Sequence, residues 1–204
     1  GRADEDSMPS TPCTACGNGT YAGEAQTSCH VCVLGTADSD MDASTPCVAC
    51  GAGFYAAAGS TVCVQCAAGY VDHDSDASTA CDGNVSGAVC AAGTYAAAGS
   101  TRCTNCSAGF ADLDSNPATA CVACAAGRAA VSEAQTSCMP CRAGTADLDA
   151  NASTACVACA AGAYSAEAAT NCTVCPAGEA DADSDPSTAC VSCGAGYHSV
   201  AGAL

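Results

Sequence analysis

Residues 47–81 read CVACGAGFYAAAGSTVCVQCAAGYVDHDSDASTAC, and this pattern recurs along the whole chain. Each copy has two halves, and a cysteine pair opens each half. The starts of successive copies are 34, 34, 40, 35 and 34 residues apart. A constant period of this length is typical of repeat proteins. The copies begin at Cys13, Cys47, Cys81, Cys121, Cys156 and Cys190.

Both ends of the chain fall inside a repeat, because GRADEDSMPSTPC at the start matches GTADSDMDASTPC from Gly35. We therefore expect the 204 residues to belong to a longer array. The predicted organisation is a partial repeat at 1–12, repeats at 13–46 and 47–80, a repeat at 81–120 with an insertion at 82–89, repeats at 121–155 and 156–189, and a partial repeat at 190–204.

The composition argues against an ordinary apolar core. Val, Leu and Phe number 14, 4 and 2, and the chain has no Ile and no Trp. That total is far below the roughly 20% of such residues found in chains that build a conventional core. Cysteine is abundant instead, with 22 residues. Many regularly spaced cysteines in a chain with little core are typical of disulfide scaffolds in oxidising, extracellular compartments.

The Cys-x-x-Cys pairs are compatible with three kinds of chemistry. Zinc ribbons use two such pairs to make a tetrahedral thiolate site. Thioredoxin-like redox sites use one pair at the start of a helix in an α/β fold. Disulfide repeats need only the spacing, and we favour them because the sequence lacks the fold context of the other two.

A ladder, in which the second cysteine of each pair bonds the first of the next, gives loops of nearly constant length. The six extra residues between Cys81 and Cys90 then lie in a connector and lengthen no loop. An interlocked pairing would lengthen one. The ladder predicts Cys16–Cys29, Cys32–Cys47, Cys50–Cys63, Cys66–Cys81, Cys90–Cys103, Cys106–Cys121, Cys124–Cys138, Cys141–Cys156, Cys159–Cys172 and Cys175–Cys190, and leaves Cys13 and Cys193 to partners outside this sequence.

The fold class predicted is small disulfide-rich repeats with short β-hairpins and little helix. A glycine follows every pair by three residues, a position suited to a tight turn with positive φ. The alanine runs are too short to hold a helix alone. Tyr21, Tyr55, Tyr95 and Tyr164 recur in the first half of a repeat, and we expect them to cover disulfides.

The second half of each repeat carries alternating acidic residues. Asp-x-Asp-x-Asp presents oxygen ligands in the way calcium loops do, although the glycine and bidentate glutamate of an EF-hand are missing. The competing interpretation is a solvated turn whose Asp, Ser and Thr side chains cap their own backbone. The candidate calcium ligands are Asp38, Asp40, Asp42, Asp72, Asp74, Asp76, Asp181, Asp183 and Asp185.

Five Asn-x-Ser/Thr sequons predict N-glycosylation. Cys106 and Cys172 occupy the middle position of two of them, where disulfide geometry would hinder modification. The acceptors are Asn18, Asn84, Asn105, Asn151 and Asn171.

The net charge of −17, with four Arg and no Lys, disfavours nucleic acid and anionic lipid as partners. The sequence has no segment typical of a membrane span. The three His have no consistently placed nucleophile beside them, and no phosphate-binding loop is present, so we do not expect an enzyme.

The repeat unit, with its Cys-x-x-Cys, a glycine three residues on, an aromatic residue and a further Cys, resembles the ephrin-receptor-like and tumour-necrosis-factor-receptor-like cysteine repeats. It is also similar to repeats of ciliate immobilisation antigens and of algal and oomycete surface proteins. The resemblance covers essentially the whole chain and implies an elongated, loop-rich extracellular rod.

Two functions follow from these observations. The first is a structural extracellular glycoprotein of a coat, fibre or flagellar-hair-like filament, with copies of the same chain or matrix proteins as partners. The second is a ligand-binding or adhesive cell-surface ectodomain, which calcium could stiffen.

Overall fold

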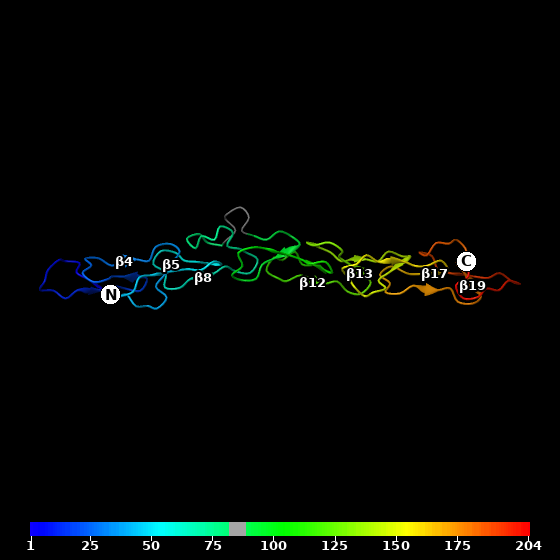
Figure 1. The fold of residues 1–204 in the computed structure, drawn as a ribbon, viewed down its shortest axis with the longest axis horizontal. Helices are drawn as coiled ribbons and strands as arrows, with labels where there is room; N and C mark the ends of the chain where they lie inside the picture. The colour runs from blue at the N-terminus through cyan, green and yellow to red at the C-terminus, as the bar shows by residue number, and fades with distance from the viewer. Residues whose placement is uncertain (82–88) are drawn as a thin grey trace. The chain divides into compact units, whose positions relative to one another are not determined.

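The computed structural model describes residues 1–81 and 89–204, and its regular structure consists of two-residue β-strands (Figure 1). These residues contain no helix, so no membrane-crossing helix occurs among them. The strands pair into antiparallel hairpins, one in nearly every half repeat. The prediction of disulfide-rich repeats with short hairpins is confirmed.

We call the hairpins first-half or second-half hairpins according to the half of the repeat that contains their loop. The first-half hairpins are β3 (Thr20–Tyr21) with β4 (His30–Val31), β7 (Phe54–Tyr55) with β8 (Val64–Gln65), β9 (Thr94–Tyr95) with β10 (Thr104–Asn105), β13 (Arg128–Ala129) with β14 (Met139–Pro140), and β17 (Ala163–Tyr164) with β18 (Thr173–Val174).

The second-half hairpins have the acidic run in their loop. They are β1 (Arg2–Ala3) with β2 (Thr14–Ala15), β5 (Thr36–Ala37) with β6 (Val48–Ala49), β11 (Phe110–Ala111) with β12 (Val122–Ala123), β15 (Thr145–Ala146) with β16 (Val157–Ala158), and β19 (Glu179–Ala180) with β20 (Val191–Ser192). In the second half of the repeat 47–80, just before the insertion, a single bridge between Tyr70 and Val89 takes the place of a hairpin.

A glycine turn starts each hairpin from β3–β4 onward. In β3–β4, the N–H of Thr20 donates to the carbonyl of Gly17 at 3.1 Å, and Gly19 has φ 73° at the third turn position. A type II turn needs positive φ at that place. All eleven glycines that follow a cysteine pair by three residues have positive φ, as the sequence predicts.

Ten disulfides are present, nine across hairpins and one across the half with the single bridge, and they have the ladder pairing. Each joins the second cysteine of one pair to the first of the next, over 13 to 15 residues. Cys66–Cys81 and Cys90–Cys103 keep the ordinary separations of 15 and 13 residues. The insertion therefore lies outside both closed loops, which is why the array tolerates it.

The interior is built from alanine and cysteine. The fully buried side chains of greatest volume are Cys32, Cys66, Cys106, Cys141 and Cys175, and most of the other buried apolar residues are alanines such as Ala22, Ala37, Ala56 and Ala96. Small residues are required because the backbones of successive halves bond directly to one another. Ala56, for example, donates its N–H to the carbonyl of Ala77 and accepts the N–H of Gly35.

The chain forms two compact units, one made of Gly1–Ala91, Tyr95–Thr104 and Asn116–Thr119, the other of Ala92–Thr94, Asn105–Ser115 and Ala120–Leu204. Both use the same bonds between repeats. In the first unit, Gly59 N–H donates to the Cys32 carbonyl at 2.8 Å. In the second, Ala134 N–H donates to the Cys106 carbonyl at 2.8 Å.

Candidate functional site

In five of the acidic runs the first aspartate is buried and bonds to backbone. Its Oδ2 accepts the N–H of a turn glycine 19 or 20 positions earlier, at 2.8 to 3.3 Å. Its own N–H donates to a carbonyl of the following half repeat, as Asp38 does to Ser60 at 3.0 Å. This aspartate therefore links three consecutive halves. The five residues are Asp38, Asp72, Asp112, Asp147 and Asp181, each no more than 7% exposed.

The next two acids form the exposed turn itself. Asp40 Oδ1 accepts the N–H of Asp42 at 3.0 Å, and Asp42 Oδ1 accepts the N–H of Ser44 at 2.9 Å. The hydroxyl of Thr45 donates to Asp40 Oδ2 at 2.9 Å. Met41, between the two aspartates, has φ 55°. These are Asx turns, the competing interpretation that the sequence offered.

The same turn recurs with Asp74 and Asp76, with Asp149 and Asn151, and with Asp183 and Asp185. These local hydrogen bonds stabilise the charged carboxylates. The N–H of Asp42, followed by the Thr45 hydroxyl, holds the pKa of Asp40 below its ordinary value. The Ser44 hydroxyl, followed by the Ser44 N–H, does the same to the pKa of Asp42.

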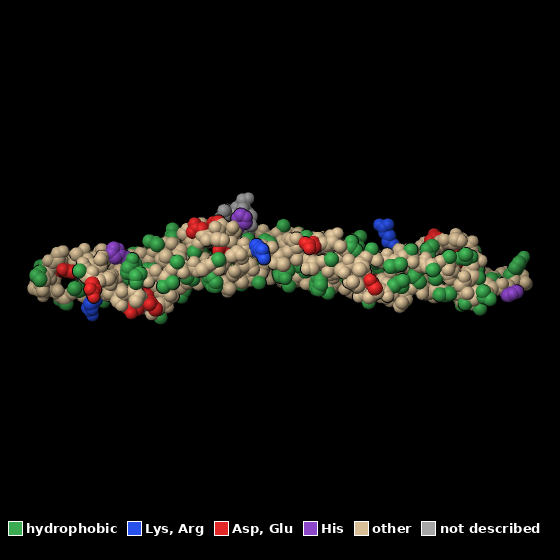
Figure 2. Space-filling model, viewed as in Figure 1, with side chains coloured by type: hydrophobic (Ala, Val, Ile, Leu, Met, Phe, Trp, Pro, Cys, Tyr) green, Lys and Arg blue, Asp and Glu red, His purple; other side chains and the backbone are tan. Residues whose placement is uncertain are grey.

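The calcium interpretation remains a prediction. Asp38, Asp72 and Asp181 point their Oδ2 atoms at glycine N–H groups, whereas the other six candidate ligands lie in exposed Asx turns. Across 1–81 and 89–204, no group of three or more His, Cys, Asp or Glu could hold a metal ion. Figure 2 shows the acidic side chains of one face in small separate groups.

Four sequons lie in the described part of the chain and expose their asparagine; Asn84 lies outside it. Asn151 is in an acidic turn, where its Oδ1 accepts both the N–H and the hydroxyl of Ser153, at 3.1 and 2.7 Å. Asn105 differs, because its Nδ2 donates to Glu133 Oε2 at 3.2 Å and Cys106 beside it is buried in a disulfide. Asn18 precedes Gly19, whose N–H is held by Asp38.

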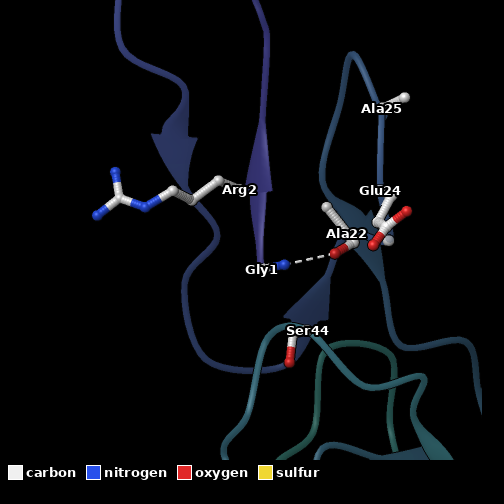
Figure 3. A pocket seen from close by; sticks show the side chains of 7 residues that line it. Gly1, Arg2, Ala22, Glu24, Ala25 and Ser44 are labelled. Carbon is white, nitrogen blue, oxygen red and sulfur yellow. Dashed lines mark hydrogen bonds between the residues drawn. The ribbon is translucent and has the colours of Figure 1, made fainter.

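Two hollows lie in the first repeats. One is lined by Gly1, Arg2, Ala22, Gly23, Glu24, Ala25 and Ser44, and there the Gly1 amine donates to the Ala22 carbonyl (Figure 3). The other, about 100 Å³, is lined by Tyr21, Val31, Cys32, Val33, Thr36 and Cys47. Tyr21 thus borders the Cys32–Cys47 disulfide, and its ring centroid lies 5.6 Å from that of His30. Neither hollow brings together groups suited to catalysis.

Cys13 and Cys193 form no disulfide within the described chain, which agrees with the ladder. Sequence reasoning missed two features of the surface and interior. It did not find the buried aspartates, although an Asp recurs 19 or 20 residues after a turn glycine. It also missed the valines that follow the cysteine opening a repeat, which are 53% to 57% exposed at Val48, Val122, Val157 and Val191.

Neither the protein-family models nor the curated proteins with which the sequence was compared give a match.

Proposed function

We propose that the chain is a structural extracellular glycoprotein that builds a surface coat, fibre or flagellar-hair-like filament from disulfide-stapled repeats. The observation that carries this proposal is the repeated interface. The same N–H···O=C bonds join each half to the next, and a disulfide closes each of ten loops. An interface that recurs identically can extend without limit, which suits a load-bearing array.

An extracellular location follows from the disulfides, because bonds of this number persist in oxidising compartments. The partners proposed are further copies of the chain or other matrix proteins. N-glycans would be carried first at Asn151, whose side chain is exposed and whose turn already brings the Ser153 hydroxyl to the asparagine.

Electron microscopy of the native material, at a resolution that shows side chains, tests the function. Ordered filaments with disulfides between successive cysteine pairs, and with glycan density at Asn151, would support it. Separate, unassembled chains that bind a ligand saturably would instead support the adhesive or receptor ectodomain.

A further inference from the structure

The chain contains one Asn-Gly dipeptide, Asn18–Gly19, in which Asn18 is exposed and Gly19 is buried. Asparagine is a chemically labile residue. It is most labile before glycine, because no Cβ hinders the approach of the glycine nitrogen to the asparagine side chain. In the corresponding turns of the other first halves, alanine stands in place of Asn18, at Ala52, Ala92, Ala126, Ala161 and Ala195.

The reaction that an Asn-Gly dipeptide undergoes requires a free glycine N–H. The nitrogen of Gly19, after losing its proton to a base in solution, would form a bond to Cγ of Asn18. The bond from Cγ to Nδ2 would then break, and the nitrogen would take up a proton and leave as ammonia. Water would open the cyclic imide at either carbonyl, which gives aspartate or isoaspartate. A hydrogen bond that holds the N–H therefore opposes the first step.

Asp38 holds this N–H in the folded protein. Its Oδ2 accepts the N–H of Gly19 at 3.0 Å, and the residue is only 4% exposed. Asp38 is itself anchored, because its own N–H donates to the carbonyl of Ser60 at 3.0 Å. The carbonyl of Gly19 accepts the N–H of Cys32 at 2.9 Å. All four residues belong to the first compact unit, and together they keep the nucleophile buried and bonded.

The contact between repeats also opposes the isoaspartate product. A Cβ added to Gly19 would collide with the carbonyl oxygen of Gly59, so the backbone of the next repeat packs directly on this glycine. In isoaspartate the main chain runs through the side-chain carbons and is longer by the Cβ atom. A longer chain at this turn would displace Gly59 or break the hydrogen bond to Asp38. Isoaspartate and the native contact therefore compete.

The turn of Gly196 is equivalent but lacks the guarding carboxylate. Gly196 has φ 88°, against 73° at Gly19, and the N–H of Tyr197 closes the turn by donating to the carbonyl of Gly194 at 3.0 Å. Among the residues that the structure describes, none accepts the N–H of Gly196. Gly196 is exposed, and an added Cβ there would meet no atom within 4 Å. The same turn thus occurs in a guarded and an unguarded form.

We propose that Asn18 is a deamidation site that Asp38 keeps closed while the repeats at 13–46 and 47–80 remain in contact. Separation of these repeats frees the N–H of Gly19, and water then converts Asn18 to aspartate or isoaspartate. The product carries a new negative charge beside Asp38, which opposes closure of the contact. This inference does not depend on the proposed structural function.

The test compares two Asn-Gly bonds within one molecule. Ala195→Asn places an asparagine before Gly196, and the oxidised chain is produced without N-glycans so that Asn18 keeps its free amide. The chain is incubated in mildly alkaline buffer, and peptide mass spectrometry follows the conversion of both amides to acids. Asn18 should convert at least about tenfold more slowly than the introduced asparagine, because a buried hydrogen bond protects only Asn18.

Substitution of Asp38 tests the guard directly. Asp38→Ala should speed the conversion of Asn18 by about tenfold or more, whereas Asp38→Asn, which keeps an acceptor oxygen, should restore most of the protection. The matched control is Asp40→Ala, since Asp40 lies in the same acidic run but bonds within its own exposed turn. This control should leave the rate at Asn18 unchanged.

A second guarded bond can be added to the same chain. Ala52→Asn places an asparagine before Gly53, whose N–H donates to Asp72 Oδ2 at 2.8 Å. This asparagine should convert as slowly as Asn18, and Asp72→Ala should release it alone.

Equal rates at Asn18 and at the asparagine before Gly196 would overturn the proposal, and so would an unchanged rate in a folded Asp38→Ala chain. Disulfide mapping shows whether that variant is folded. If it is not, the comparison within the Ala195→Asn chain decides, because that chain keeps Asp38. Slow conversion at Asn18 with fast conversion before Gly196 would support the guard.

Discussion

At the scale of single residues, glycine and aspartate fix how successive repeats meet. A Cβ added to Gly19 would lie 2.0 Å from the carbonyl oxygen of Gly59, in the next repeat, and Gly53 meets Gly99 in the same way at 2.1 Å. The side chain is absent because a backbone atom occupies its place. The recurring glycine thus serves both the turn and the contact between repeats.

Gly19→Ala should destabilise the first repeats by more than about 2 kcal/mol, because it adds a steric clash to the cost of a left-handed conformation. Thermal unfolding followed by circular dichroism measures the effect. Gly196→Ala is the control, since Gly196 has φ 88° with no atom within 4 Å of an added Cβ. Equal losses of stability in the two variants would show that the close approach of Gly59 to Gly19 does not add to the cost of the substitution.

In the native protein the buried N–H of Gly53 donates to Asp72 Oδ2 at 2.8 Å. Asp72→Ala removes this acceptor, so it should lower the free energy of unfolding by about 1–3 kcal/mol and expose the Gly53 N–H to hydrogen exchange. Asp72→Asn, which keeps an acceptor oxygen, should recover much of the loss. Hydrogen exchange at Gly53 is the measurement. The exposed Asp74→Ala should leave exchange at Gly53 unchanged, and rapid exchange there would contradict the assignment.

At the scale of elements, the hairpin and its disulfide form the unit of order. The sequence predicts the halves, the turn glycines and the ladder, because spacing alone constrains them. It does not predict the buried aspartates or the exposed valines. The carboxylate of Asp38 accepts a glycine N–H from the preceding half, and its own N–H donates to a carbonyl of the following half. These contacts join three halves, so the sequence pattern of a single hairpin does not predict them.

Cys66→Ser should unravel residues 67–80 and leave Cys81 as a free thiol, with a loss of about 3 kcal/mol from the opened loop. Limited proteolysis and thiol labelling would locate the change. Cleavage confined to that loop, with Cys50–Cys63 intact, is expected. Unchanged protease resistance within the loop would argue against a stabilising role for this disulfide.

The acidic turns should loosen in acid. The folded pKa of Asp40, Asp74 and Asp183 lies below the ordinary value because backbone N–H groups and threonine hydroxyls donate to the carboxylates. A lowered pKa contributes stability above the unfolded value of about 3.9, and that contribution is lost as the pH falls through the folded pKa. Carboxylate titration by NMR should show midpoints below about 3.9 while the disulfides stay intact.

At the scale of the whole molecule, alanine and cysteine replace the usual core. Buried alanines supply little apolar area, so the covalent links and the backbone bonds between repeats carry the order. Reduction without denaturant should therefore abolish the β signal in circular dichroism throughout the chain, whereas the oxidised chain should resist heating. Retention of ordered structure after complete reduction would show that packing alone suffices.

The ladder also determines how the chain would behave under tension. Force would pass across each disulfide, where the two Cα atoms are about 5.6 Å apart, and then along the short Cys-x-x-Cys link, bypassing the closed loops. A repeat pulled taut would reach roughly 33 Å, against more than about 110 Å for the same residues without crosslinks. The crosslinks therefore limit each repeat to less than about a third of its uncrosslinked contour length, and reduction removes that limit.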